Sequence, residues 1–306
     1  RKAEPLVRQA VAVYQESLGE EHPIIIPSLY HLGEIARNLG GPEALEEAAE
    51  SFHRAAELVR KSSGPDSLEY AQSLMYRASI FHQMNRFDDS ETLYQEALGL
   101  LKILVGEESP EYTDTLLGLA RLYHSMQNRS AAEVRYQQVL EIRQKTVGEE
   151  DPEFAQALLD LAGLHHDVGD LRSAEQLYLR AIEIQREALG NDSPVFAQSL
   201  QNLALVYQSM GQFEEAEPHY RQALEILAEA YGEKHPDYLR ALHSQALLYQ
   251  AKDELGEAEL KLRQVVETQR ELLADNHPEL APPLLELARI QRSMGKLLQA
   301  EKLFPD

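Results

Sequence analysis

The chain has 306 residues, 43% of them hydrophobic, and a formal net charge of −22 at pH 7. Such an excess of acid disfavours nucleic acids and anionic membrane surfaces as ligands, because both need clustered lysine and arginine. The chain has no cysteine, which excludes disulfides, thiolate metal ligands and a cysteine nucleophile. No apolar run approaches the roughly 18 residues of a membrane-spanning helix, so we expect a cytoplasmic protein.

A period of 42 residues runs along the chain in three separate series of residues. The series are glycines (Gly64, Gly106, Gly148, Gly190, Gly232), prolines (Pro110, Pro152, Pro194, Pro236, Pro278) and Ala-Glu pairs (Ala132-Glu133, Ala174-Glu175, Ala216-Glu217, Ala258-Glu259, Ala300-Glu301). Self-similarity at a fixed period of roughly 20–50 residues is typical of proteins built from stacked repeats. Such proteins usually act by presenting a binding surface.

Each repeat is predicted to be a pair of helices, a first helix A and a second helix B. In residues 194–232, a first helical stripe ends at Gly211 and a second ends at Gly232. The stripes consist of Ala197, Leu200, Leu203, Ala204 and Tyr207, and of Phe213, Ala216, Tyr220, Ala223, Leu224 and Leu227. The loop between repeats has the form Gly-Glu-Glu-Asp-Pro, in which glycine supplies a left-handed cap and proline presets the next helix.

Taken in chain order, the pattern predicts a single array over residues 1–306. It consists of a half repeat (1–19), six full repeats (22–64, 66–106, 109–148, 151–190, 193–232, 235–274) and a truncated repeat (277–306). Neither end resembles the polar cap that normally closes a stacked array, so we expect the chain to be a piece of a longer one. The fold class is all-α, an α-solenoid of stacked antiparallel helix pairs.

One turn breaks the period, because residues 40–44 carry three more residues than the other turns between helices A and B. The simpler interpretation is a tolerated surface loop, and the alternative is a feature at the rim that a partner recognises.

The small residues Ala204 and Ala216 and the aromatic residues Tyr207 and Tyr220 resemble the pattern of the tetratricopeptide repeat. The 42-residue length, the inter-repeat loop and the string from Asn202 to Ile226 are similar to the kinesin-light-chain class of this family. The resemblance extends over nearly the whole chain. It implies that helix A lines a concave groove and helix B the convex side.

On the basis of this resemblance, the candidate ligand contacts are helix A residues that do not take part in helix packing. These candidates are His124, Asp160, His166, Gln198, Gln201, Asn202, Leu205, Gln208, Arg240 and His243. We expect the main anchors around Gln198, Asn202, Leu205 and Arg240, with His124, Asp160 and His166 setting orientation.

We call the sets of equivalent groove-facing helix A positions in successive repeats the groove columns. Taken together, these positions are formally neutral, although the chain is strongly acidic. They hold Arg37, Arg121, Arg240, Arg289 and Arg292 against Glu34, Asp114, Asp160, Asp167 and Glu286. The excess acid lies in the inter-repeat loops and at the starts of the B helices, where carboxylates also favour the helix dipole. We interpret this excess as a solvent-exposed acidic surface on the convex side. The alternative is that the convex side is a docking surface for a basic partner.

Histidine is enriched in the same columns, and His82, His124 and His166 stand one repeat apart in one of them. Helices pack about 8–10 Å apart, so a single metal ion is not expected to bind all three. A polar lining is the simpler interpretation, and binding tuned by pH is the alternative. The pair His165-His166, near Asp167 and Asp170, is a weak metal signal, and we expect neither a metal nor a cofactor.

The position of Asn202 is one where the kinesin-light-chain class often carries an asparagine that holds the backbone of a bound peptide. The corresponding positions hold Gly118, Asp160, Ser244 and Glu286. Kinesin-light-chain grooves are basic and favour acidic peptides, and this balanced groove departs from them.

No phosphate-binding glycine loop, zinc-protease motif or nucleophile elbow is present, so we expect no catalytic residues. The leading hypothesis is a non-catalytic module that binds a peptide or helix of a partner protein in its groove. The alternative is a sensor or autoinhibitory domain of a larger signalling enzyme, such as a kinase, a signalling ATPase or a caspase-like protease. A third hypothesis is an intracellular cargo adaptor on the kinesin-light-chain model, which would need an upstream coiled coil.

Overall fold

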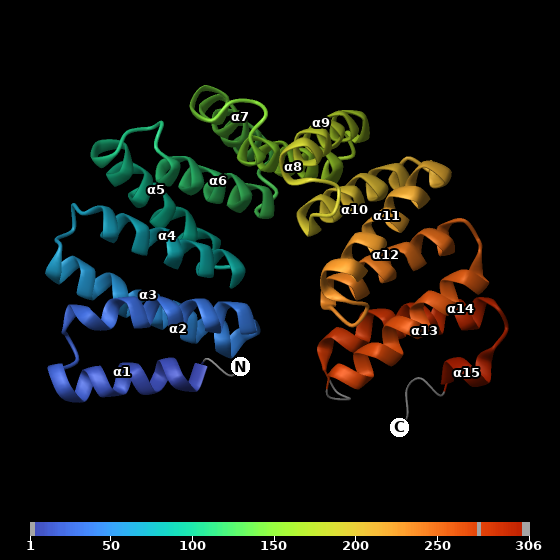
Figure 1. Ribbon diagram of the computed structural model, residues 1–306, viewed down its shortest axis with the longest axis horizontal. Helices are drawn as coiled ribbons and strands as arrows, with labels where there is room; N and C mark the ends of the chain where they lie inside the picture. Colours follow the sequence, from blue (N-terminus) through green and yellow to red (C-terminus); the bar gives the residue numbers. More distant parts are fainter. Residues whose placement is uncertain (1–3, 274–276, 302–306) are drawn as a thin grey trace. The chain divides into compact units, whose positions relative to one another are not determined.

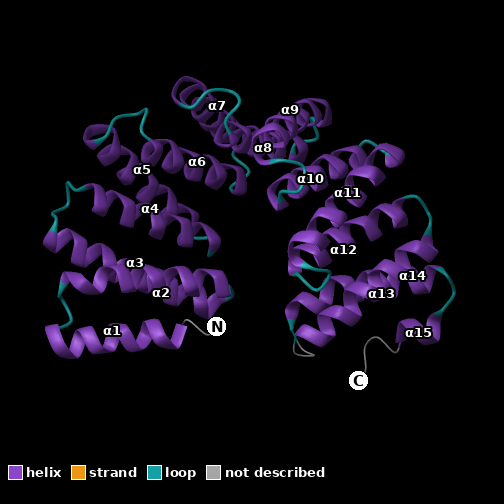
Figure 2. Cartoon of the chain, viewed as in Figure 1, coloured by secondary structure: helices purple, strands orange, loops and turns teal. Residues whose placement is uncertain are grey.

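The computed structural model describes residues 4–273 and 277–301, and every regular element in these residues is a helix (Figures 1 and 2). The all-α fold predicted from the sequence is thereby confirmed. The packing divides the chain into two compact units, residues 1–148 and 149–306. The sequence predicts one array.

Unit 1 contains three complete helix pairs preceded by one single helix. Its helices are α1 (Glu4–Leu18), a short 3-10 helix (Pro23–Ile25), α2 (Ile26–Leu39), α3 (Pro42–Ser62), α4 (Leu68–Gln83), α5 (Phe87–Leu104), α6 (Pro110–Ser125) and α7 (Arg129–Thr146). Consecutive helices pack on one another throughout the unit (Figure 1).

Unit 2 repeats this arrangement with the remaining helix pairs. Its helices are α8 (Pro152–Asp167), α9 (Leu171–Leu189), α10 (Pro194–Ser209), α11 (Phe213–Tyr231), α12 (Pro236–Ala251), α13 (Leu255–Leu272), a 3-10 helix (Pro278–Leu280), α14 (Ala281–Ser293) and α15 (Leu297–Glu301). The even-numbered helices are the A helices of the sequence pattern, and the odd-numbered ones are the B helices.

The A helices also contact one another directly, as α4 contacts α6, α8 contacts α10, and α10 contacts α12. No two successive B helices pack as closely within the described residues. We call the side of each unit that its A helices form the A face. Because successive A helices pack closer together than successive B helices, side chains from neighbouring repeats lie next to one another on this face.

Small residues allow each helix pair to close, as the sequence predicts. Ala204 in α10 and Ala216 in α11 are both fully buried. An aromatic residue from the B helix fills the space beside them, and Tyr220 is 1% exposed. The equivalent residues Phe52, Tyr94, Tyr136 and Tyr178 are buried in the same way. Burial of a large side chain of this kind stabilises the fold by roughly 1.5–3 kcal/mol.

The loops between repeats have the predicted conformation. The glycines at the loop starts have φ values between +84° and +91°, from Gly19 to Gly232. His22, His235 and His277 each precede a proline and cap the following helices. In each case Nδ1 accepts a hydrogen bond from the backbone N–H two residues later, at 3.2–3.3 Å.

The three extra residues of the first repeat do not form the loop that the sequence suggests. They lengthen the start of α3, which has 21 residues compared with 18 in α5. Ala48 of α3 and Ser90 of α5 both lie four residues before the buried ring of their helix, at Phe52 and Tyr94. Helix α3 therefore begins about one turn earlier, directly after a turn in which Gly40 and Gly41 have positive φ.

In the repeats after the first, the turn from helix A to helix B contains one residue in the left-handed region, and in some of them this residue is not glycine. Gly211 has φ +74°, whereas Gln127 holds the same place with φ +57°. A non-glycine residue costs roughly 1–2 kcal/mol there, while glycine loses about 0.5–1 kcal/mol more chain entropy on folding.

We therefore expect Gln127→Gly to raise the free energy of unfolding by about 0.5–1 kcal/mol, because the relief of strain exceeds the entropy cost. Urea denaturation measures this change, and Gly211→Gln is the matched control that should lower the free energy of unfolding. Destabilisation by Gln127→Gly would contradict the assignment of strain.

Candidate functional site

Nine of the ten candidate residues lie in unit 2, on the consecutive A helices α8, α10 and α12, and His124 lies on α6 of unit 1. Helix α8 contributes Asp160 and His166, helix α10 contributes Gln198, Gln201, Asn202, Leu205 and Gln208, and helix α12 contributes Arg240 and His243. The packing of α10 against both α8 and α12 brings these nine positions onto one A face.

Helix α10 presents a stripe of polar and apolar side chains along this face. The Nε2 group of Gln198 donates to Oδ1 of Asn202 at 3.3 Å, one helical turn away. Leu205 follows on the same side and is 44% exposed, although it is a large apolar residue. At the end of the helix, the hydroxyl of Tyr220 donates to Oε1 of Gln208 at 3.3 Å. The stripe thus combines one exposed amide, Gln198, and two half-buried amides, Asn202 and Gln208, with one exposed apolar side chain.

Gln201 does not belong to this accessible stripe, in contrast to its selection from the sequence. It is 7% exposed, and its Nε2 lies 3.5 Å from the carbonyl oxygen of Ala197 in the same helix. Leu117 and Leu159, at the same position in other repeats, are also buried. The helix rotation places this column against the neighbouring A helix, so it serves packing more than ligand contact.

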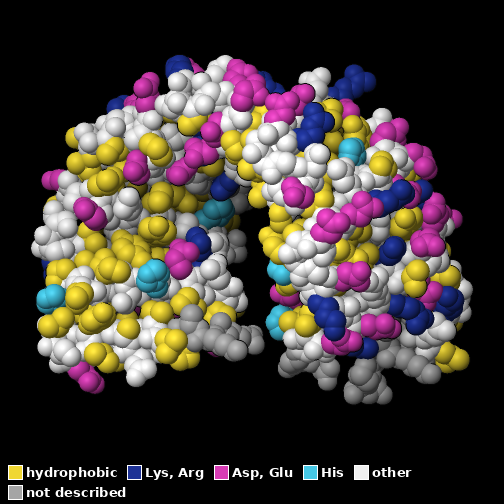
Figure 3. Space-filling view, viewed as in Figure 1, with side chains coloured by type: hydrophobic (Ala, Val, Ile, Leu, Met, Phe, Trp, Pro, Cys, Tyr) yellow, Lys and Arg dark blue, Asp and Glu magenta, His cyan; other side chains and the backbone are white. Residues whose placement is uncertain are grey.

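Several charged residues of the groove columns are paired within their own units. Arg37 bonds to Glu34 and Arg289 bonds to Glu286, both within a single helix turn. Arg240 forms an ion pair with Asp237, also in its own helix. The buried guanidinium of Arg143, on a B helix, lies 3.0 Å from a carboxylate oxygen of Asp114. Figure 3 shows the same intermixing on the visible face of unit 2, where dark blue and magenta side chains adjoin.

The histidines of one column bind serines of the next repeat. His82 Nε2 lies 2.7 Å from Ser125 Oγ in unit 1, and His166 Nε2 lies 3.0 Å from Ser209 Oγ in unit 2. Burial lowers the pKa of His82, and the nearby Arg121 lowers it further. A lowered pKa disfavours the charged imidazolium, so the structure favours a polar lining at His82 over a pH sensor. The sequence did not identify the serine partners, because they lie in a different column.

The glutamate of the repeated Ala-Glu pair joins one repeat to the next. Glu217 accepts a hydrogen bond from the hydroxyl of Tyr249 at 3.4 Å and forms an ion pair with Lys252 at 2.8 Å. The equivalent Glu259 accepts from Gln291 at 3.1 Å and from Lys296 at 2.5 Å. Glu91 accepts in the same way from the hydroxyl of Tyr123. This series in the sequence is therefore structural and lies apart from the α10 stripe.

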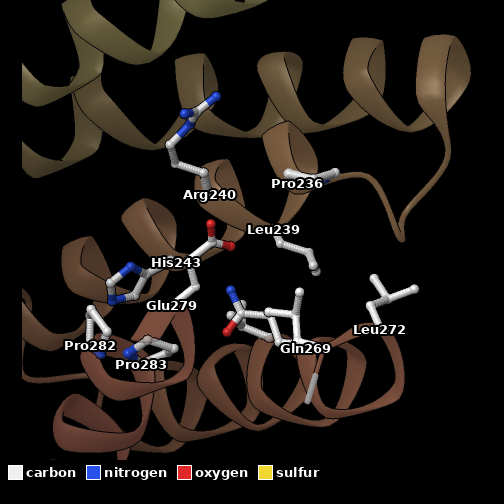
Figure 4. Close-up of a pocket in the computed structure, with 11 residues that line it drawn as sticks. Pro236, Leu239, Arg240, His243, Gln269, Leu272, Glu279, Pro282 and Pro283 are labelled. Atoms are coloured by element: carbon white, nitrogen blue, oxygen red, sulfur yellow. The ribbon is translucent and has the colours of Figure 1, made fainter. Parts of the chain in front are cut away.

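A pocket of about 410 Å³ in unit 2 was not predicted from the sequence (Figure 4). It lies between the start of α12, the end of α13 and the start of α14. Two of its residues, Arg240 and His243, are candidates from the A columns, whereas Gln269 belongs to the B helix α13 and Glu279 to the 3-10 helix Pro278–Leu280. Burial lowers the pKa of His243. The pocket could not be predicted from the A columns alone, because its walls come from four elements, namely α12, α13, the second 3-10 helix and α14.

The described residues contain no group of three or more His, Cys, Asp or Glu side chains placed to hold a metal ion. His165 and His166 instead contact separate carboxylates, with Nδ1 of His165 3.2 Å from Asp170 and Nδ1 of His166 3.4 Å from Asp167. Across the part of the chain that the structure describes, no helix has the length and hydrophobicity needed to cross a membrane.

Comparison with known proteins identifies the family. A sequence profile of the tetratricopeptide repeat matches residues 43–103, 73–145, 153–229 and 195–271, and a second such profile matches residues 1–24. No curated protein matches the chain significantly.

Several solved structures share the fold. A putative kinesin light chain from Podosopora anserina, with nearly identical TPR-like repeats, is 26% identical with a TM-score of 0.58, over 66% of this chain and 95% of that one. BtubC (BKLC) from P. vanneervenii is 22% identical with a TM-score of 0.65, over 77% of this chain and 94% of that one.

A Rap protein complexed with Competence and Sporulation Factor is 14% identical with a TM-score of 0.55, over 98% of this chain and 96% of that one. At their lower identities, BtubC and the Rap protein show the shared fold alone. The family profiles match well over half of the chain, and the structure is a series of stacked helix pairs. The chain belongs to the tetratricopeptide repeat family, in its kinesin-light-chain-like class, and is a protein-interaction module.

Proposed function

We propose that the A face of unit 2 binds an extended peptide or a helical segment of a partner protein, and that the chain itself is non-catalytic. The observation that carries this proposal is the stripe on α10, where the half-buried Asn202 and the exposed Leu205 lie three residues apart on one helix. An amide side chain can both donate to and accept from a peptide unit, and an apolar side chain adds a hydrophobic contact.

The hydrogen bonding around Asn202 supports this role. Its Oδ1 already accepts from Gln198, which holds the amide in one orientation. Within the described residues its Nδ2 group has no acceptor, so the N–H bonds are available to the carbonyl oxygen of a bound peptide. Arg240, 64% exposed at its side chain, adds a cation on the neighbouring helix α12. Preorganised groups of this kind reduce the entropy cost of binding.

We expect the double substitution Asn202→Ala and Arg240→Ala to weaken binding about tenfold or more, which corresponds to roughly 1.4 kcal/mol. Peptides selected from a random display library on the wild-type chain provide the ligands, and fluorescence anisotropy measures the dissociation constants. Both side chains are half-buried or exposed, so the free energy of unfolding should change by no more than about 0.5 kcal/mol for each substitution.

The matched control is Asn191→Ala with Arg221→Ala, which removes the same two residue types away from the A face. Arg221 is 63% exposed and pairs with Glu217 within its helix, much as Arg240 pairs with Asp237. Selected peptides should bind the control variant as they bind the wild type. Equal binding by the A-face variant would rule out this face as the binding site.

The sensor or autoinhibitory role in a larger signalling enzyme remains a hypothesis, as does the cargo adaptor. A binding face on unit 2 is compatible with both, because each requires recognition of a protein segment.

A further inference from the structure

The pocket in unit 2 combines apolar walls with polar groups that have no partner. Its walls are built by Pro236, Leu239, Val265, Leu272, Leu273, Pro282 and Pro283. The volume of about 410 Å³ lies in the range of roughly 300–1,000 Å³ that is typical of ligand pockets. In Figure 4 the amide of Gln269 and the carboxylate of Glu279 lie between Leu239 and Leu272 on one side and His243 with the two prolines on the other.

Two buried polar atoms in this pocket lack hydrogen bonds. They are Oε1 of Gln269 and Nε2 of His243, and neither has a partner within the described part of the chain. A carbonyl oxygen accepts only, so Gln269 can bind a ligand group that donates a hydrogen bond. Burial lowers the pKa of His243, so its imidazole is neutral at pH 7, and a neutral imidazole nitrogen can accept a hydrogen bond.

The charges around the pocket favour a cation. Glu279 is exposed at the pocket, and its carboxylate forms no ion pair among the described residues. Arg240 also lines the pocket, but it pairs with Asp237, and its guanidinium extends away from Gln269 in Figure 4. The chain as a whole carries a formal charge of −22, which attracts cationic ligands and repels anionic ones.

We propose that this pocket binds an arginine side chain of the partner protein. The aliphatic part of the side chain would pack on Leu239 and Leu272, and the guanidinium N–H groups would donate to Gln269, His243 and Glu279. A guanidinium presents five donors in a fixed plane and can therefore reach several separate acceptors, which the compact ammonium of lysine cannot do as well. The assignment rests on the proposed function in one respect, namely that the ligand is part of a protein.

The test uses the methyl NMR signals of Leu239, Val265 and Leu272 in the full chain. Nα-acetyl-arginine amide is titrated at millimolar concentrations against the citrulline analogue, which has nearly the same shape without the charge. We expect saturable shifts of these methyl signals with the arginine probe, and at least tenfold weaker binding of the citrulline probe. The lysine analogue should bind more weakly than the arginine probe.

The substitutions Gln269→Leu and Glu279→Gln should each reduce binding of the arginine probe at least fivefold. Gln185→Leu is the matched control, because Gln185 is buried with an unpartnered Oε1 at the same helix position two repeats earlier, away from the pocket. It should bind the probe as the wild type does. Unchanged methyl signals outside the pocket show that each variant is folded.

Equal binding of the arginine and citrulline probes would overturn the proposal, as would the absence of saturable shifts with the arginine probe. Stronger shifts of the same methyl signals with the glutamate analogue would also overturn it. Asn202→Ala should leave probe binding unchanged, since Asn202 does not line the pocket. A failure of peptide binding at the A face is thereby distinguished from a failure of the arginine pocket.

Discussion

Replacing Glu259 by alanine is expected to lower the free energy of unfolding by about 2–3 kcal/mol at pH 7. The carboxylate is buried, with 8% of the side chain exposed, and joins α13 to the following repeat. It accepts from Lys296 at 2.5 Å, from Arg263 at 2.8 Å and from Gln291 at 3.1 Å. Breaking a buried ion pair costs roughly 3–5 kcal/mol, and the partial exposure of both cations reduces that cost here.

The same residue should make stability depend on pH in the acid range. Burial alone would raise the pKa of Glu259, but the hydrogen bonds from Lys296, Arg263 and Gln291 outweigh it and lower the pKa to about 2 from 4.5. Between these two values the unfolded chain binds a proton that the folded chain does not. The stabilisation is therefore complete above pH 4.5 and is lost as the pH falls toward 2.

Urea denaturation of the wild type and Glu259→Ala between pH 7 and pH 2.5 measures both effects. The difference in free energy of unfolding between the two proteins should shrink below pH 4.5. Glu141→Ala is the control, because Glu141 also pairs with a lysine but is exposed, so little change is expected. A difference between wild type and Glu259→Ala that stays constant down to pH 2.5 would contradict the assigned pKa.

Replacing Gly118 by asparagine should destabilise the protein by about 1–3 kcal/mol, the usual cost of overpacking a core. Gly118 occupies the position that Asn202 holds in unit 2. A Cβ atom there would lie 2.8 Å from the ring of Tyr94, which is 3% exposed and cannot move into solvent. The substitution is therefore expected to disturb the packing between α5 and α6 and not to create a second asparagine site.

The matched control is Gly99→Asn, since Gly99 is also helical but has open space where a Cβ would stand. We expect it to change the free energy of unfolding by no more than about 0.5 kcal/mol, the usual range for surface substitutions. A double-mutant cycle of Gly118→Ala with Tyr94→Leu should show favourable coupling, because the smaller side chain makes room. Independent effects of the two substitutions would show that the ring does not set the cost.

The packing at this position differs from that one repeat earlier. There Tyr76 stacks on Phe52 with ring centroids 5.3 Å apart. At Gly118 the ring of Tyr94 takes the space instead.

The sequence alone determined the helix pairs, their order and their turns. These features depend on local chemistry that recurs with the period, such as a left-handed glycine at the loop and a proline in the first helical turn. Ala204, Ala216 and Tyr220 could be assigned to the core for the same reason, since helical periodicity fixes which side of a helix they face. The family resemblance followed from the same residues.

Only the tertiary structure decided which candidate residues remain accessible and which groups have partners. Gln201 and Asn202 are adjacent in sequence and equally polar, yet one is buried against a neighbouring helix and the other stays accessible. The pocket around Gln269 and Glu279 requires four elements to meet, and the period contains no information on where side chains from different elements leave a space. A repeat in sequence fixes local conformation, whereas accessibility and hydrogen bonding depend on how neighbouring repeats pack.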